Sequence, residues 1–276
     1  MSETLLISSL PPPFIKGGGF LVDEEKYNWQ NLCVQSWLDT GHTIASINEP
    51  DEISSLKSIY PNINFIAANR TTKTANNRPL VYISDAINFG KIQNFKRLAL
   101  CNADVLITKK LNTPEITESC IDLFFSNRIN IDSTESTTGE IFGGIDYFNM
   151  SLEFSRTLPE TLFAFGLPWW DYWLPAFALN KNTWPQKLVT ENSLPILLHK
   201  KHPDAWRTDD FCILGNHFFK LAFTSFTPNS SFGSLDKEYQ KFSLSTPSPD
   251  ICKLLAQQAR SVSQFINENS PEYRLS

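Results

Sequence analysis

A carboxamide and a carboxylate two residues apart, Asn102 and Asp104, interrupt an almost continuous apolar run from Arg97 to Thr108. Such a run is typical of a strand that is covered on both faces in a parallel sheet. Polar side chains near the carboxyl end of such a strand open into the crevice where α/β sheets bind ligands. Asp104 could therefore hold a divalent cation, Mn²⁺ or Mg²⁺, against the two phosphates of a nucleotide diphosphate. Alternatively, this is a polar strand end whose aspartate caps the next turn.

A second candidate site is the aromatic segment that follows Pro168. One acid, Asp171, lies among four aromatic residues: Trp169, Trp170, Tyr172 and Trp173. Aromatic rings offer a platform on which the apolar face of a sugar can stack. A partly desolvated carboxylate beside them can accept a hydrogen bond or act as a general base. The alternative is a core cluster in which Asp171 caps a short helix that starts after Trp170.

Two histidines form a third candidate site. His199 follows an apolar run, 195–198, that predicts a strand, and His202 lies three residues further along the chain. On a helix, residues at this spacing share a face, and two imidazoles with one acid can ligate a metal ion. The basic residues around them could neutralise a phosphate. A charged surface turn is the alternative interpretation of this segment.

Helices and strands alternate through the first half of the chain. Apolar residues at spacings of three and four predict helices over 24–40, 53–60, 80–94 and 113–127. Short apolar runs predict strands over 43–48, 63–67 and 97–108. Gly41 lies where a helix takes its left-handed C-terminal residue, and Thr113 followed by Pro114 is typical of a helix start.

The pattern changes in the second half. Two strands are expected at 129–132 and 145–150, with an exposed loop between them at 133–140. Residues 158–201 are rich in proline and tryptophan and predict short helices and packed irregular structure. A long amphipathic helix is predicted over 251–267, after a linker at 243–249 and before a frayed tail at 269–276.

Composition limits the possible classes of protein. A length of 276 residues corresponds to one large or two small domains, at about 150 residues per domain. The formal net charge of -5 provides no basic face and argues against nucleic-acid binding. No apolar stretch is long enough for a transmembrane helix, and the N-terminal region lacks the basic residues of a secretion signal. We therefore expect a cytoplasmic protein.

Several common catalytic motifs are absent. The sequence contains no GxxxxGK[ST], GxGxxG, HExxH or GxSxG motif, so ATPase, dinucleotide dehydrogenase, zincin and serine hydrolase activities have no support. The run Gly17–Gly19 is either a phosphate cradle or flexible N-terminal punctuation. The five cysteines are widely spaced without a CxxC pair, so buried thiols are expected rather than a disulfide framework or a zinc knuckle.

The order of these features resembles that of the nucleotide-diphospho-sugar transferases of the GT-A fold. The resemblance spans about residues 14–220 and is carried by five segments: Gln30–Leu38, Leu98–Leu106, Phe142–Asn149, Pro168–Leu174 and His199–Trp206. It implies a single Rossmann-like α/β domain with a mixed, mostly parallel sheet flanked by helices. It also implies a transferase domain over 14–242, with a nucleotide-binding half at about 14–110, an acceptor half at about 111–242, and a linker and C-terminal helix, 243–276, packed on the domain.

The resemblance assigns a role to the polar residues after Arg97. In this family an Asp-x-Asp motif holds the metal ion and the diphosphate. Here Asn102 replaces the first acid and Asp104 is the second. One carboxylate binds Mn²⁺ or Mg²⁺ more weakly than two, so His199 or the diphosphate would have to supply the missing ligands.

The resemblance also implies roles outside the metal motif. Asp171 is the best positional match to the catalytic base of inverting members, and Asp146 is the second. Arg70 and Arg78 match regions that contact the nucleotide or the diphosphate. The acceptor would lie against four aromatic residues: Trp169, Trp170, Tyr172 and Trp173.

The expected activity is transfer of a sugar from a nucleotide-sugar donor to a hydroxyl of a carbohydrate or glycan acceptor, in glycan or polysaccharide synthesis. Two alternatives stay open. A non-catalytic carbohydrate-binding or scaffold protein with the same fold would explain Asn102 and the aromatic cluster. A metal-dependent hydrolase would use three residues near the third candidate site: His199, His202 and Asp204.

Overall fold

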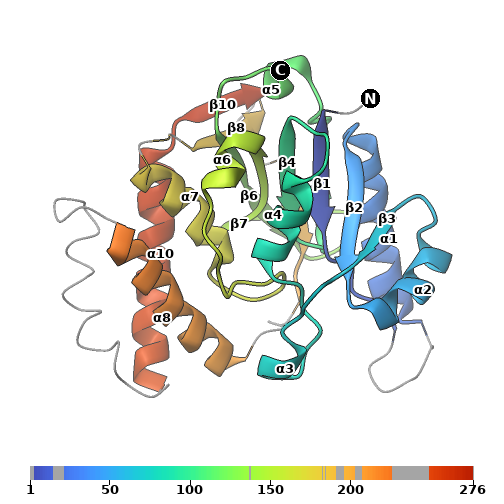
Figure 1. Cartoon of the computed structure of the whole chain (residues 1–276), viewed down its shortest axis with the longest axis horizontal. Helices are drawn as coiled ribbons and strands as arrows, with labels where there is room; N and C mark the ends of the chain where they lie inside the picture. Colours follow the sequence, from blue (N-terminus) through green and yellow to red (C-terminus); the bar gives the residue numbers. More distant parts are fainter. Residues whose placement is uncertain are drawn as a thin grey trace.

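The computed structural model describes residues 3–14, 22–136, 138–181, 183, 185–190, 196–202, 207–225 and 249–275. A ten-stranded sheet runs through its centre (Figure 1). Its strands are β1 Thr4–Ser8, β2 Thr43–Asn48, β3 Asn64–Ala67, β4 Arg97–Cys101, β5 Val105–Ile107, β6 Leu123–Ile131, β7 Glu140–Ser151, β8 Gln186–Thr190, β9 Leu197–Lys200 and β10 Glu272–Leu275.

The sheet is mixed and mostly parallel, as predicted. The strand order is β10-β8-β6-β7-β4-β1-β2-β3, and β9 pairs with β5 and β6 beside this path. β7 runs antiparallel to β4 and β6, and β5 runs antiparallel to β9; the other described pairs are parallel. This arrangement confirms the predicted α/β fold.

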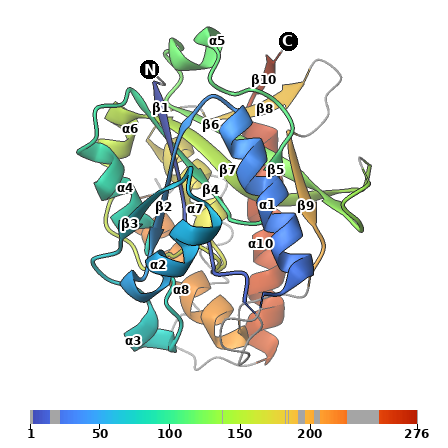
Figure 2. The same ribbon diagram turned by 90° about the vertical axis from the view of Figure 1, so that its right-hand side faces the viewer.

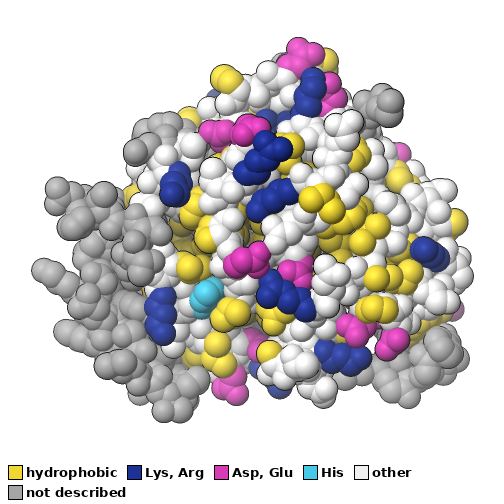
Figure 3. Space-filling model, viewed as in Figure 1, with side chains coloured by type: hydrophobic (Ala, Val, Ile, Leu, Met, Phe, Trp, Pro, Cys, Tyr) yellow, Lys and Arg dark blue, Asp and Glu magenta, His cyan; other side chains and the backbone are white. Residues whose placement is uncertain are grey.

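Helices cover both faces of the sheet (Figures 1 and 2). They are α1 Glu24–Asp39, α2 Pro50–Ile59, α3 Lys73–Asn76, α4 Ile83–Lys91, α5 Pro114–Thr117, α6 Leu152–Thr157, α7 Trp170–Asn180, α8 Thr208–Ser225 and α10 Pro249–Asn269. None of the helices in the described ranges combines the length and the apolar character that crossing a bilayer requires. On the face shown in Figure 3, acidic and basic side chains are interspersed.

The core consists of two apolar layers, one on each face of the sheet. On β1, Leu5 and Ile7 belong to one layer and Leu6 to the other, and β4 alternates in the same way. The first layer lies under α4, α6, α7, α8 and α10, and the second under α1, α2 and α5. Because β1 and β4 are buried on both faces, their sequences are continuous apolar runs.

Helix α1 fixes the segment that carries Asp104. The indole N–H of Trp29 donates to the carbonyl of Asp104 at 3.0 Å, and that of Trp37 donates to the carbonyl of Val105 at 2.9 Å. These bonds satisfy backbone groups where the chain leaves β4. Helix α1 ends at Asp39 with Thr40 as its C-cap, and Gly41 follows. The φ of 83° at Gly41 confirms the predicted left-handed position.

Two predictions around this segment were wrong. The run 97–108 is not one strand: Asn102–Asp104 turn the chain, so β4 stays beside β1 whereas β5 pairs with β9. The helix predicted over 113–127 is limited to α5, and its expected second half is the start of β6. Its apolar residues are buried by pairing with β7, a non-local contact that outweighs their helical spacing.

The segments at both ends of the described chain form strands of the sheet. β1, for which the sequence predicted no strand, pairs with both β2 and β4. The tail expected to fray over 269–276 instead forms β10, which pairs in parallel with β8. The sheet thus takes strands from both sides of residues 14–242, and α10 packs its buried face against the layer that contains α7 and α8.

The cysteines follow the expectation in part. Cys33 and Cys101 are buried thiols and Cys120 is an exposed one. Cys212 is disulfide-bonded, which its spacing in the sequence did not indicate. The linker expected at 243–249 and the run Gly17–Gly19 lie outside the described residues, except for Pro249, which begins α10.

A buried histidine links α1 and β2 to the centre of the sheet. His42 is 7% exposed, and its Nε2 lies 3.1 Å from the hydroxyl of Tyr147 on β7. The Nδ1 atom is buried without a hydrogen-bond partner in the described part of the chain. Burial lowers the pKa of His42 from 6.5 to about 3, because a charged imidazole would lose its hydration. The folded protein therefore holds His42 neutral.

We predict that His42 makes folding sensitive to acid. Above pH 6.5 both states are neutral at this site. Below pH 6.5 the imidazole of His42 is protonated in the unfolded chain but stays neutral in the folded chain. The free energy of unfolding therefore falls between pH 6.5 and about 3, by up to about 1.4 kcal/mol per pH unit. Denaturant unfolding at several pH values should show a shallower loss for His42→Gln. Burial also lowers the pKa of the half-buried His217, so His217→Gln is the comparison and should flatten the slope less than His42→Gln. Equal slopes for wild type and His42→Gln would contradict the prediction.

Candidate functional site

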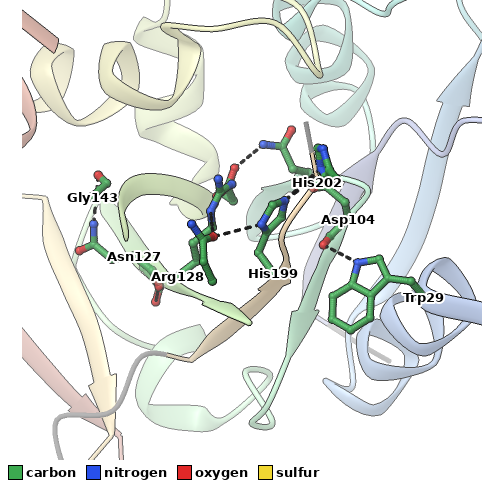
Figure 4. Close-up of polar contacts among 11 residues, drawn as sticks. Trp29, Asp104, Asn127, Arg128, Gly143, His199 and His202 are labelled. Atoms are coloured by element: carbon green, nitrogen blue, oxygen red, sulfur yellow. Dashed lines mark hydrogen bonds and ion pairs between the residues drawn. The ribbon is translucent and has the colours of Figure 1, made fainter. Parts of the chain in front are cut away.

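Asp104, His199 and His202 meet beyond the carboxyl end of β4. Their nearest ligand atoms all lie within 4.8 Å of one another, which makes them a candidate cation site (Figure 4). Asp104 Oδ2 lies 3.6 Å from His199 Nε2 and 3.1 Å from His202 Nε2. His199 is held by β9, which pairs with β5, and β5 begins after the three residues that follow β4. The non-local β5–β9 pair therefore brings the first and third sequence candidates together.

The hydrogen bonds of Asn130 determine which nitrogen of His199 carries a proton. Arg128 Nε donates to Asn130 Oδ1 at 3.1 Å, and since arginine can only donate, this amide atom is an oxygen. His199 Nδ1 lies 3.1 Å from the same oxygen and must donate to it. In the neutral imidazole, Nε2 then has the free lone pair. A partner on the far nitrogen is the usual way in which proteins orient a metal-binding histidine.

The donor atoms of this group fit a divalent cation. His199 Nε2 lies 3.2 Å from His202 Nε2, so the two nitrogens need a shared proton or a cation between them. Burial alone would raise the pKa of Asp104, but its contacts with His199 and His202 outweigh burial and hold that pKa below its usual range. One carboxylate with two imidazoles suits Mn²⁺ or a similar transition metal better than Mg²⁺, which prefers oxygen ligands.

A buried ion pair lies beside the candidate cation site. Asp146 on β7 is 3% exposed, and its Oδ2 lies 2.5 Å from a terminal nitrogen of Arg128 on β6. Its other oxygen accepts a hydrogen bond from the side-chain amide of Asn102, and its carbonyl accepts one from the Asn102 backbone N–H at 3.0 Å. Both oxygens of Asp146 are therefore occupied, which favours a positioning role over a role as a base.

Asp171 is the acid with an unused oxygen. It lies in the first turn of α7, and its Oδ1 is buried without a hydrogen-bond partner among the described residues. Burial, reinforced by the charge of Asp146, raises the pKa of Asp171 to about 7, although Arg128 opposes the shift. Arg128 in turn interacts with the charges of three carboxylates: Asp146, Asp104 and Asp171. The candidate cation site and Asp171 thus border the same arginine.

The structure buries most of the aromatic cluster. Trp169, Trp170 and Trp173 are 1–3% exposed and belong to the core layer under α7 and α8. They leave no exposed ring face on which a sugar could stack, which favours the alternative of a core cluster. Tyr172 is half-buried and is the member of the cluster that retains a partly exposed ring. Asp171 does not cap this helix: α7 begins at Trp170 with Trp169 as its N-cap, so Asp171 lies two residues beyond the cap.

The two arginines expected to contact the nucleotide lie in separate ion-pair clusters. Arg70 forms ion pairs with Asp85 and Glu160, both at 2.8 Å. Arg78 is half-buried and lies 3.9 Å from Asp210 on α8. Neither contacts the candidate cation site in the described structure.

Three residues of the site carried no assigned role in the leading sequence interpretation. His202 entered only through the hydrolase alternative, while Arg128 and Asn130 lie in a segment whose first part was predicted as a helix. Alternation along β6 could have shown that these two share a face. Asp204, the third residue of the hydrolase alternative, lies outside the described residues.

Comparisons with known proteins match this chain in structure alone. No family model and no curated protein matches the sequence. Among solved structures, the inositol-1-phosphate CTP transferase from T. maritima has a TM-score of 0.44 at 7% identity, covering 75% of this chain and 92% of that one. A protein of Desulfovibrio desulfuricans G20, provisionally described as a nucleotide-diphospho-sugar transferase, has a TM-score of 0.40 at 12% identity over 100% of both chains.

A third similar structure is HddC from Yersinia pseudotuberculosis, with a TM-score of 0.37 at 14% identity, covering 62% of this chain and 85% of that one. All three TM-scores lie below 0.5. At these identities the similarity concerns the α/β fold alone. The roles of the site residues depend on their geometry.

We predict that the Arg128–Asp146 pair is needed for stability. Arg128→Met would leave a buried, unpaired carboxylate, which typically costs about 3–5 kcal/mol. Asp146→Asn in the same chain removes that charge and should recover most of the loss in denaturant unfolding. Arg156→Met, at an exposed arginine paired with Glu153, is the control and should change little. A single Arg128→Met variant as stable as wild type would show that the pair is not required.

We also predict that Asn130 supports cation binding through His199. Without Asn130 Oδ1, nothing among the described contacts fixes His199 Nδ1 as the protonated nitrogen. Asn130→Ala should therefore weaken Mn²⁺ binding about 10- to 100-fold, measured by calorimetry. Asn127→Ala is the control, because Asn127 lies on the same strand but bonds the carbonyl of Gly143 (Figure 4). Equal Mn²⁺ affinity in both variants and wild type would refute this role.

Proposed function

We propose that the chain transfers a sugar from a nucleotide-diphosphate-sugar donor to an acceptor hydroxyl. One observation carries the proposal: a three-residue candidate cation site and a buried carboxylate with an unused oxygen border the same arginine, Arg128. The site follows the carboxyl end of β4, where α/β sheets commonly bind ligands. The motif order that resembles GT-A transferases supports the same activity.

Asp104, His199 and His202 would hold the cation, and Mn²⁺ can accept both their imidazole and their carboxylate donor atoms. When bound, the ion supplies positive charge that stabilises a departing diphosphate. Asn130 keeps His199 in the tautomer whose Nε2 faces Asp104. Arg128 adds fixed positive charge beside the group, held in place by Asp146.

Asp171 would take the proton of the acceptor hydroxyl. A general base works best when its pKa lies close to the operating pH, and burial brings Asp171 to about 7. The unused Oδ1 can accept the hydroxyl proton without breaking an existing hydrogen bond. Asp146 raises the basicity of Asp171 through its charge, while its own two oxygens remain bonded to Arg128 and Asn102.

Metal-dependent hydrolysis is the second candidate function. The inclusion of His202 in the candidate cation site favours it, since catalytic zinc sites commonly have three protein ligands and an open position for water. The two functions differ in product. Transfer yields a glycosylated acceptor and a nucleoside diphosphate, whereas hydrolysis consumes substrate without an acceptor.

The donor is identified by a thermal-unfolding screen of UDP, GDP, CMP and their sugar conjugates, with and without Mn²⁺. A ligand at about 100 times its dissociation constant adds about 2.7 kcal/mol of stability. We expect one nucleotide to stabilise the protein, more strongly with Mn²⁺, and Asp104→Asn to remove the Mn²⁺ increment. Asp39→Asn, at an exposed aspartate on α1, is the matched control. No stabilisation by any nucleotide would favour the carbohydrate-binding scaffold instead.

With the donor identified, we predict that Asp171→Asn lowers the transfer rate about 10²- to 10⁴-fold, since a general base contributes that much, and leaves donor affinity unchanged. The base must be ionised, so the wild-type rate should rise with pH and level off above about 7. Rate measurements from pH 5 to 9 test both points. A collapse of donor affinity at an unchanged rate per bound donor would overturn the base assignment.

A further inference from the structure

Arg78 and Arg207 share one acid at the edge of the molecule where α3 and the start of α8 meet (Figure 1). Asp210 Oδ2 lies 3.9 Å from a terminal nitrogen of Arg78, 3.5 Å from Arg207 Nε and 3.2 Å from the Arg207 backbone nitrogen. Among the residues that the structure describes, this one carboxylate lies against two guanidinium groups and so compensates only one of their two positive charges. Asp209, the other acid of this turn, forms no ion pair with either arginine in the described ranges.

The Arg78 guanidinium has an unused donor. Its Nη1 atom is buried and has no hydrogen-bond partner among the described residues. A buried donor of this kind costs free energy unless water, an ion or a ligand satisfies it. Burial lowers the pKa of Arg78; the charge of Asp210 raises that pKa, and the charge of Arg207 lowers it.

The local backbone holds Arg78 in this position. Asn77, just before it, is in the left-handed conformation, with a φ of 58°. The Thr72 hydroxyl donates to the Arg78 carbonyl at 2.7 Å, and the Arg78 N–H donates to Asn76 Oδ1 at 3.1 Å. Arg207 is tied to the same turn, since its guanidinium donates to the Asn76 carbonyl at 3.1 Å. The same turn therefore positions both arginines, and both guanidinium groups lie against Asp210.

The start of α8 connects this arginine pair to the segment that carries Asp171. The first turn of α8 packs on Trp169, whose indole N–H donates to the Phe211 carbonyl at 2.9 Å. Asp171 follows Trp169 by two residues, in the first turn of α7. The segment with Arg78 follows β3, so it lies at the same edge of the sheet as the residues that follow β4.

We propose that Arg78 and Arg207 bind an anionic group, a phosphate or a carboxylate, carried by the acceptor. Arginine presents donors in a planar fork that matches both groups, and two such forks select for charge on the ligand. The inference rests on the proposed function: if Asp171 is the base, the acceptor binds near Asp171, and therefore near this arginine pair. The acceptor is then a sugar phosphate or an acidic sugar rather than a neutral one.

The test measures binding to the full chain by calorimetry with glucose 6-phosphate, glucuronate and glucose, in the absence of any donor. We expect at least one of the two anions to bind at least about tenfold more tightly than glucose. Arg78→Met and Arg207→Met should each weaken that binding about 10- to 100-fold, since each removes charge-assisted hydrogen bonds. Arg78→Lys keeps the charge without the fork and should retain part of the affinity. Arg156→Met, which removes an exposed arginine elsewhere, should have no effect.

Several outcomes would overturn the inference. Equal affinity for glucose and both anions would show that charge is not selected, and unchanged anion binding in both arginine variants would place the anion elsewhere. Weaker UDP binding in Arg78→Met, with sugar anions unaffected, would assign the pair to the donor. If Arg78→Met does not fold, Arg207→Met decides, because Arg207 is exposed. If the wild-type chain binds the sugar anion but transfers no sugar, the proposed function is wrong and the anion site is still supported.

Discussion

The buried carboxylate of Asp146 is the constraint on which the site depends. A charge this deep is tolerated only when it is paired and hydrogen-bonded, because an unpaired one loses its hydration without return. Arg128 from β6 and Asn102 from the end of β4 meet this need. Asp146 on β7 therefore connects β6 with the residue that follows β4. These contacts hold the polar groups of the site in place.

This constraint extends to the candidate cation site through one further residue. Arg128 uses its terminal nitrogen for Asp146 and its Nε for Asn130, and Asn130 in turn orients His199 toward Asp104. The same negative charge also disfavours ionisation of Asp171. One buried acid thus bears on a metal ligand and on the candidate base, which explains how a site with a single carboxylate in its metal motif can remain organised.

The sequence predicted what local pattern determines and missed what distant pairing determines. The bounds of β2 and the left-handed Gly41 follow from apolar runs and turn chemistry within a few residues. β1 and β10 are short segments that become strands only through partners far along the chain. Asp104 and His199 could be predicted as partners because each ends an apolar run. Arg128 and Asn130 were not, because the first part of β6, up to residue 127, was predicted as a helix and only 129–132 as a strand.

Asn102 is the residue that most weakened the metal prediction, and the structure gives it a reason to be an amide. Its Nδ2 donates to Asp146, and an aspartate at this position would present a second carboxylate that has no proton to donate. Two ionised acids in contact there would repel each other and raise the pKa of one of them. The change from acid to amide therefore accompanies the buried Asp146. In the candidate cation site, His199 on β9 and His202 just after it offer the ligand atoms that a second acid would otherwise supply.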